Sequence, residues 1–187
     1  MNKRKILLNP GPVTLSDRVR ASLQKIDLCH RENNFAELLK EVKRKLLEVY
    51  DLESEGHDAV VLSGSGTLAV EAMLSSLISE EDKTLVLTNG VYGERMAQMM
   101  KLHNKHHDVM KENWQDSVNL ISLEELLKKS SYSKLLLVHN ETTTGRLNDL
   151  KAVLRICEKF NVKVLLDGVS SFGAEEINFN YPALQAL

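Results

Sequence analysis

Two apolar runs joined by a helical pattern constrain the fold of this chain most. Leu135 to Val138 and Val162 to Leu166 are almost uninterrupted stretches of Leu and Val, which is typical of strands covered on both faces. Residues 147–160 lie between them and have the apolar spacing of an amphipathic helix. Parallel neighbours need such a crossover because a hairpin cannot join them. The sequence therefore predicts a βαβ unit.

The same alternation extends along most of the chain. Strands are predicted at Ala59 to Leu62 and at residues 84–88, and each is followed by a helix, at residues 67–78 and 92–102. The capping-box pattern SLEE, Ser122 to Glu125, predicts the start of one more helix. We expect an α/β fold with a mostly parallel sheet and helices on both faces.

Two amphipathic helices are expected before this alternation begins. Ser16 is a plausible N-cap for the first, in which Val19, Leu23 and Ile26 share one face. The second covers residues 35–49. No repeat or Gly/Ser-rich linker follows, so we predict an N-terminal segment over residues 1–15 and a single domain over residues 16–187.

Composition excludes several classes of protein. The 187 residues carry 24 basic and 26 acidic side chains, a balance that selects neither nucleic acid nor an anionic membrane. Cys29 and Cys157 are far apart and form no CxxC pattern, which argues against a disulfide scaffold and a zinc site. The short apolar run after the basic start does not resemble a signal peptide. These features predict a soluble protein of the reducing cytoplasm.

Ligands of open parallel sheets bind beyond the carboxyl ends of the strands. The segments at these positions are SGSGT, TNGVYG, HNETTTG and DGVSSFG. In SGSGT, Gly64 and Gly66 allow a tight turn whose free amides at a helix N-terminus could bind phosphate, although a plain turn is an equal alternative. Gly64, Gly66 and Ala69 also fit a loose dinucleotide pattern, GxGxxA. That pattern needs an acidic residue after the next strand, where this chain has Thr88 and Asn89.

A combination of polar side chains favours a different phosphorylated cofactor. Asp167 ends an apolar run, so a cationic partner would offset its desolvation, although a lone strand-end Asp is more often a cap or an ion pair. Tyr92 could cover an aromatic ring, and Thr142 to Thr144 form a hydroxyl cluster. Together with the phosphate turn, these groups match the requirements of pyridoxal 5'-phosphate.

Five segments carry a resemblance to a known family. NPGPV, SGSGTLAVEAM, NGVYGERM, HNETTTGRLN and LLDGVSSFGA, in this order, resemble the class V, fold-type I aminotransferases, which depend on pyridoxal 5'-phosphate. The likeness is strongest to their 2-aminoethylphosphonate:pyruvate branch. Serine:pyruvate and alanine:glyoxylate transaminases are the alternative branch, with ESSTG-like and VAS-like loops. The resemblance implies a partial large domain of this fold and association into a homodimer or with a C-terminal half.

The resemblance also implies roles for individual residues. Ser65, Gly66 and Thr67 match the phosphate-binding turn, and Tyr92 matches the aromatic residue that stacks on the cofactor. Thr142 matches the hydroxyl near the ring substituents, and Asp167 matches the partner of the pyridinium nitrogen.

No catalytic residue is assigned within this chain. In the family, the Schiff-base lysine lies some twenty to thirty residues beyond this aspartate, which is past Leu187. Lys151, Lys159 and Lys163 are expected to be surface charges, away from the strand ends. We therefore expect an inactive or split portion of an enzyme. A non-catalytic association domain on the same scaffold is the hypothesis from another class.

Three further features have ordinary explanations. His103, His106 and His107 could suggest a metal site, but the neighbouring lysines favour a solvated helix end. Arg31 and Glu32 resemble a family segment near the active-site entrance, with a surface ion pair as the equal alternative. The methionines at positions 96, 99 and 100 are expected in a helix core.

Overall fold

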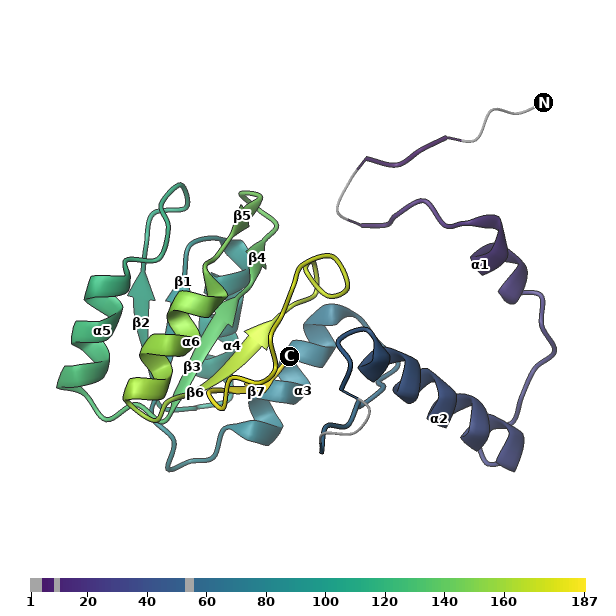
Figure 1. The fold of residues 1–187 in the computed structure, drawn as a ribbon, viewed down its shortest axis with the longest axis horizontal. Helices are drawn as coiled ribbons and strands as arrows, with labels where there is room; N and C mark the ends of the chain where they lie inside the picture. Colours follow the sequence, from purple (N-terminus) through teal and green to yellow (C-terminus); the bar gives the residue numbers. More distant parts are fainter. Residues whose placement is uncertain (1–4, 9–10, 53–55) are drawn as a thin grey trace. The chain divides into compact units, whose positions relative to one another are not determined.

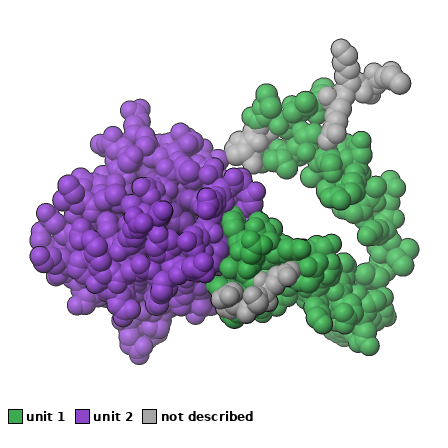
Figure 2. All heavy atoms as spheres, in the orientation of Figure 1, with its two compact units in different colours: residues 1–61 green, residues 62–187 purple. Residues whose placement is uncertain are grey.

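The computed structural model describes residues 5–8, 11–52 and 56–187. The chain, drawn as a ribbon in Figure 1, divides into two compact units, residues 1–61 and 62–187, which Figure 2 shows in different colours. The division falls inside the range that was predicted as one domain. Asn9 and Pro10 of the NPGPV segment lie outside the described residues.

Unit 1 contains helices α1 (Asp17–Ser22) and α2 (Asn33–Glu48). Ser16 caps α1 as predicted, because its side chain accepts a hydrogen bond from the Val19 amide at 3.3 Å. The prediction of a longer first helix was wrong, since Leu23 is already its C-cap residue and Ile26 lies beyond it. Both side chains are at least 80% exposed, so no buried face supports further turns.

The predicted strand at Ala59 to Leu62 is absent, because residues 57–62 have no regular secondary structure. Val60 is 81% exposed and Val61 46%. A strand requires a partner for its backbone groups, and the described part of the chain gives this segment none. The apolar pattern of Ala59 to Leu62 alone was therefore not enough to predict a strand.

Unit 2 is an α/β layer structure around a parallel sheet, which confirms the predicted fold class. Its strand order is β2-β1-β3-β6-β7, and every pair in it is parallel. The elements of unit 2 are α3 (Gly66–Leu77), β1 (Thr84–Thr88), α4 (Val91–Leu102), β2 (His107–Lys111), α5 (Leu120–Lys129), β3 (Lys134–Val138), β4 (Asn140–Glu141), β5 (Arg146–Leu147), α6 (Leu150–Lys159), β6 (Lys163–Asp167) and β7 (Leu184–Ala186).

The sheet is covered on both faces, as Figure 1 shows. Helices α3 and α4 pack together and against the central strands, and α5 packs beside α6 on the opposite face. The core on the α3 and α4 side includes Val86, Leu136 and Leu165, which come from three neighbouring strands. The predicted core methionines Met96, Met99 and Met100 belong to the same cluster.

Several elements were missed or misplaced. The edge strands β2 and β7 and the β4–β5 hairpin were not predicted, because short strands with exposed positions lack a continuous apolar run. Helix α5 begins at Leu120 and not within SLEE. Its cap is Asn119, whose side chain accepts a hydrogen bond from the Ser122 amide at 3.0 Å. Ser122 is therefore inside the first turn.

The three-strand core allows a direct test of stability. Leu165 is fully buried, so Leu165→Ala should lower the free energy of unfolding by about 2–5 kcal/mol through lost burial and a residual cavity. Leu102→Ala is the matched control, because Leu102 is 73% exposed, and should change it by less than about 0.5 kcal/mol. Urea unfolding measures both, and equal losses would contradict the assigned core.

Candidate active site

The SGSGT segment forms the N-terminus of α3. Ser65 is the N-cap, and its hydroxyl accepts a hydrogen bond from the Leu68 amide at 3.4 Å. The amides of Gly66 and Thr67 precede the first intrahelical bond and have no acceptor among the described residues. Two free donors at the positive end of a helix dipole therefore face the same region, which suits an anion.

Gly66 brings this turn close to the loop after β6. A Cβ atom at Gly66 would lie 2.8 Å from a methyl carbon of Val169, closer than van der Waals contact allows. Val169 is two residues after Asp167. The turn at residues 65–67 therefore lies close to Asp167, the predicted partner of the pyridinium nitrogen. The absence of a side chain at position 66 makes this approach possible.

Tyr92 lies in the first turn of α4 and is partly buried. The Arg95 guanidinium lies over its ring, with the central carbon 5.0 Å from the ring centroid, which is within cation–π range. Arg95 Nη1 also donates a hydrogen bond to Thr67 Oγ1 at 3.1 Å. Arg95 thus connects the aromatic residue to the α3 turn, although the sequence analysis did not single it out.

Glu141 was also missed, and it positions the start of α4. Its side chain is completely buried and accepts hydrogen bonds from the Tyr92 amide at 3.4 Å and the Gly93 amide at 3.2 Å. The Thr143 hydroxyl donates to the same carboxylate at 2.7 Å. Glu141 therefore joins the β4–β5 hairpin to the helix that carries Tyr92. The one available signal was its place in the ETTTG segment.

Thr142 lies in the turn of that hairpin, between β4 and β5, and is partly buried. Its hydroxyl has no hydrogen-bond partner among the described residues, in contrast to the neighbouring Thr143 and Thr144 hydroxyls. Thr142 directly follows Glu141 in the chain. Within the described part of the chain, no hydrogen bond joins Thr142 to the other predicted site residues.

Asp167 ends β6 as predicted and is only 7% exposed. Burial raises the pKa of its carboxyl group above the ordinary value of 3.8, and the Val169 amide, which donates to Oδ1 at 3.0 Å, opposes this. The Glu141 carboxylate raises the pKa further and the Arg95 guanidinium lowers it. Oδ2 has no donor among the described residues, so it can accept a bond from a ligand.

Buried polar pairs hold these loops together. His139 Nδ1 lies 3.0 Å from Ser171 Oγ, which joins the segment after β3 to the one after β6. Burial lowers the pKa of His139, opposed by Glu175, which favours a neutral ring beside the Ser171 hydroxyl. On the other side, the buried Asn89 amide donates to Asn148 at 2.8 Å and connects the end of β1 to the same edge.

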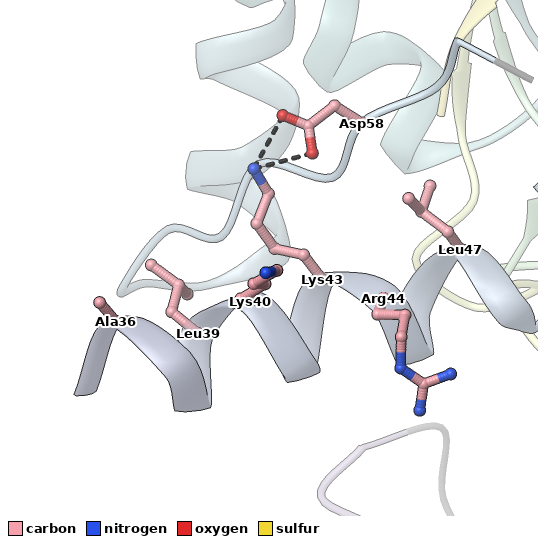
Figure 3. Close-up of a pocket in the computed structure, with 7 residues that line it drawn as sticks. All are labelled: Ala36, Leu39, Lys40, Lys43, Arg44, Leu47 and Asp58. Atoms are coloured by element: carbon pink, nitrogen blue, oxygen red, sulfur yellow. Dashed lines mark hydrogen bonds and ion pairs between the residues drawn. The ribbon is translucent and has the colours of Figure 1, made fainter. Parts of the chain in front are cut away.

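A separate surface hollow of about 440 Å³ lies along α2 in unit 1 (Figure 3). Lys43 on its wall is ion-paired with Asp58 at 2.7 Å, and Arg44 is paired with glutamates of α2. None of the predicted site residues lines it. The convergent polar groups are in unit 2, and we take that edge of the sheet as the candidate site.

The remaining polar features have local explanations. His103 is bonded to Glu71 at 2.8 Å, and His107 begins β2, so the predicted helix end holds only the first of the three histidines. Over the described ranges, no three His, Cys, Asp or Glu side chains are grouped to bind a metal.

None of the described helices is long and apolar enough to cross a membrane. Glu32 is the N-cap residue of α2, and its side chain makes no capping bond.

The arrangement is an α/β domain that brings helix N-terminal amides without an acceptor in the described part of the chain, an aromatic ring and a buried carboxylate close together. The sequence pattern described as Aminotransferase class-V matches residues 17–182. The chain therefore belongs to the class V aminotransferase family, whose members depend on pyridoxal 5'-phosphate.

Individual relatives agree with this family. The chain is 35% identical over 179 residues to a 2-aminoethylphosphonate--pyruvate transaminase of Bacillus cytotoxicus, covering 95% of this chain and 48% of the relative. A solved alanine--glyoxylate aminotransferase from Nostoc sp. matches with a TM-score of 0.83 and 28% identity, over 95% of this chain and 46% of that one. A pyridoxamine-pyruvate aminotransferase from Mesorhizobium loti matches with a TM-score of 0.84 and 26% identity, over 92% and 44%. The chain thus spans about half the length of these proteins.

Because Gly90 lies against the Glu141 side chain, substitutions at these two positions should have non-additive effects on stability. A Cβ at Gly90 would lie 2.2 Å from Cγ of Glu141, so Gly90→Ala should displace the carboxylate and lower the free energy of unfolding by about 1–3 kcal/mol. In a Glu141→Ala background the clashing atoms are gone, and the same substitution should cost far less. A double-mutant cycle by urea unfolding measures this, and additive losses would contradict the assigned contact.

Burial of Asp167 should lower the stability of the folded protein by an amount that depends on pH. Its folded pKa lies above its unfolded value near 3.8, so the folded state holds the proton more tightly and loses stability as pH rises through that interval. Asp167→Asn should therefore be more stable than the wild type at pH 7, and this gain should vanish below about pH 4. Urea unfolding across pH measures the difference.

The exposed Asp116 provides the control for this experiment. Asp116→Asn removes the same charge from the surface and should not raise the free energy of unfolding between pH 4 and pH 7. A gain of equal size at both positions would mean that net charge, and not burial of Asp167, is responsible.

Proposed function

We propose that the protein to which these residues belong moves the amino group of 2-aminoethylphosphonate to pyruvate, forming phosphonoacetaldehyde and alanine. The family and the 35% identity to a transaminase of that name support this assignment. The observation that carries it is the convergence of the α3 N-terminus, Tyr92 and Asp167 at one edge of the sheet.

The residues present fit pyridoxal 5'-phosphate. The free amides of Gly66 and Thr67, with the Ser65 and Thr67 hydroxyls, would bind its phosphate, and Tyr92 would cover its ring. Thr142 would lie near the ring substituents. The bound cofactor supplies an electron sink for the carbanion that forms when the amino donor loses a proton.

Asp167 would hold the pyridinium nitrogen. Its second oxygen is available, and a cationic partner would favour the ionised carboxylate that burial otherwise disfavours. The charge of Asp167 would in turn keep the pyridine nitrogen protonated. A bound pyridinium cation would therefore offset the desolvation of the Asp167 carboxylate at the end of β6.

The covalent lysine is proposed to come from outside unit 2. Lys159 is bonded to Glu124, Lys163 donates to the Pro182 carbonyl, and Lys151 is exposed on α6, as predicted for surface charges. Lys111 is the last residue of β2 and is paired with Glu94 at 3.0 Å. Among the described residues, Arg95 is the one cation that shifts the pKa of Asp167.

Turnover would then require further sequence, either in the same polypeptide or from a partner such as a second copy in a homodimer. This chain alone would be the cofactor-binding half. The likeness to an alanine--glyoxylate aminotransferase keeps a second donor class, alanine or serine with glyoxylate or pyruvate, as the alternative. A non-catalytic association domain would bind no cofactor at this edge.

Labelling tests this division of labour. After incubation with pyridoxal 5'-phosphate and borohydride reduction, peptide mapping of the 187-residue chain should find only scattered, substoichiometric pyridoxyl-lysine. Stoichiometric labelling of one lysine would show that the chain contains the covalent site. Absence of any cofactor binding would favour the association domain.

The same preparation distinguishes the donors. Alanine should form from 2-aminoethylphosphonate and pyruvate when the missing lysine-bearing region is supplied, and not with this chain alone. Faster amino transfer from alanine or serine to glyoxylate would replace the proposed donor with the alternative branch.

A further inference from the structure

Arg95 is the cation that contacts the predicted phosphate turn. It lies one helical turn after Tyr92 in α4, and its Nη1 donates to Thr67 Oγ1 at 3.1 Å. Among the described lysines and arginines of unit 2, Arg95 alone bonds to residues 65–67. Its guanidinium is also fixed over the Tyr92 ring, 5.0 Å from the centroid. Two independent contacts therefore hold the charge in place.

The direction of the hydrogen bond determines what Thr67 can do. A guanidinium has donors and no acceptor, so the Thr67 hydroxyl must accept from Arg95. A hydroxyl has one proton, which remains available to donate to another acceptor. On the same turn, the amides of Gly66 and Thr67 have no acceptor within the described part of the chain. Arg95 thus leaves Thr67 as a third donor toward an anion at the helix N-terminus.

We propose that Arg95 is a positioning residue for the cofactor phosphate, acting through the Thr67 hydroxyl and adding a positive charge beside the α3 turn. This inference rests on the proposed function, since it assigns that site's phosphate end. It predicts that Arg95 distinguishes phosphorylated from unphosphorylated ligands. A role limited to holding the Tyr92 ring or the fold would not make this distinction.

The test compares two ligands, pyridoxal 5'-phosphate and pyridoxal, by fluorescence titration of the 187-residue chain. Arg95→Gln should weaken binding of the phosphate ester by about 10-fold and leave pyridoxal binding unchanged. Thr67→Val should give the same selective loss. In the Thr67→Val background, Arg95→Gln should have a clearly smaller effect, because the bond between them is already missing.

Matched variants control for charge and folding. Arg155→Gln removes the same charge from the exposed surface of α6 and should bind both ligands as the wild type does. Arg95→Lys keeps the charge but not the planar fork, and should retain part of the preference for the phosphate ester. Far-UV circular dichroism checks that each variant is folded. If Arg95→Gln does not fold, Arg95→Lys and Thr67→Val decide the question.

The outcomes separate this inference from the function on which it rests. A wild-type chain that binds neither ligand overturns both. Wild-type preference for the phosphate ester with no change in Arg95→Gln overturns the role of Arg95 alone. Equal loss of both ligands in Arg95→Gln also overturns it, because Arg95 would then act through the ring or the fold.

Discussion

The parallel register of β1, β3 and β6 determines where every candidate group lies. Val86 pairs with Leu136, and Val138 pairs with Asp167, so these strands end at the same edge of the sheet. Both faces of these strands are covered, so the register is marked by their ends, where Lys134 pairs with Lys163 at the start and Asp167 pairs with Val138 at the other end. The loops that follow the strands must therefore meet. The contact between His139 and Ser171 depends on that alignment, because it joins the segments that follow β3 and β6.

Two carboxylates lie buried at this edge, and they are stabilised in different ways. Glu141 accepts several amide and hydroxyl bonds, which replace the water that it loses on folding. Among the described residues, Asp167 accepts a hydrogen bond from one amide, that of Val169, and its other oxygen has no donor. Glu141 is thus committed to holding α4 and the hairpin. Asp167 remains incompletely compensated, which is the condition that a cationic ligand would relieve.

The sequence predicted the parts of the fold that depend on strong local patterns. The strands ending at Val138 and Asp167, and the helix between them, have continuous or periodic apolar residues and were predicted within a few positions. The edge strands β2 and β7 have exposed positions and few apolar residues, so only pairing with their neighbours reveals them.

The candidate site was predictable to a smaller extent. The residue types at Ser65, Tyr92 and Asp167 indicated a phosphate turn, an aromatic cover and a carboxylate. Their connections were not predictable, because Arg95 to Thr67 spans 28 positions and Glu141 to Gly93 spans 48. Contacts at such separations depend on the sheet topology and not on any pattern within one segment.

The failed strand at Ala59 to Leu62 shows which interactions form the phosphate turn. Residues 57–62 lack a ladder, yet Ser65 caps α3 and Gly66 packs against Val169. The turn geometry therefore comes from a local cap and from the loop after β6, and it does not need a strand before it. Because Val169 is two residues from Asp167, the spacing between the anion-binding amides and the buried carboxylate is set within unit 2. The two ends of a phosphorylated aromatic cofactor would thus be held by parts that pack on each other.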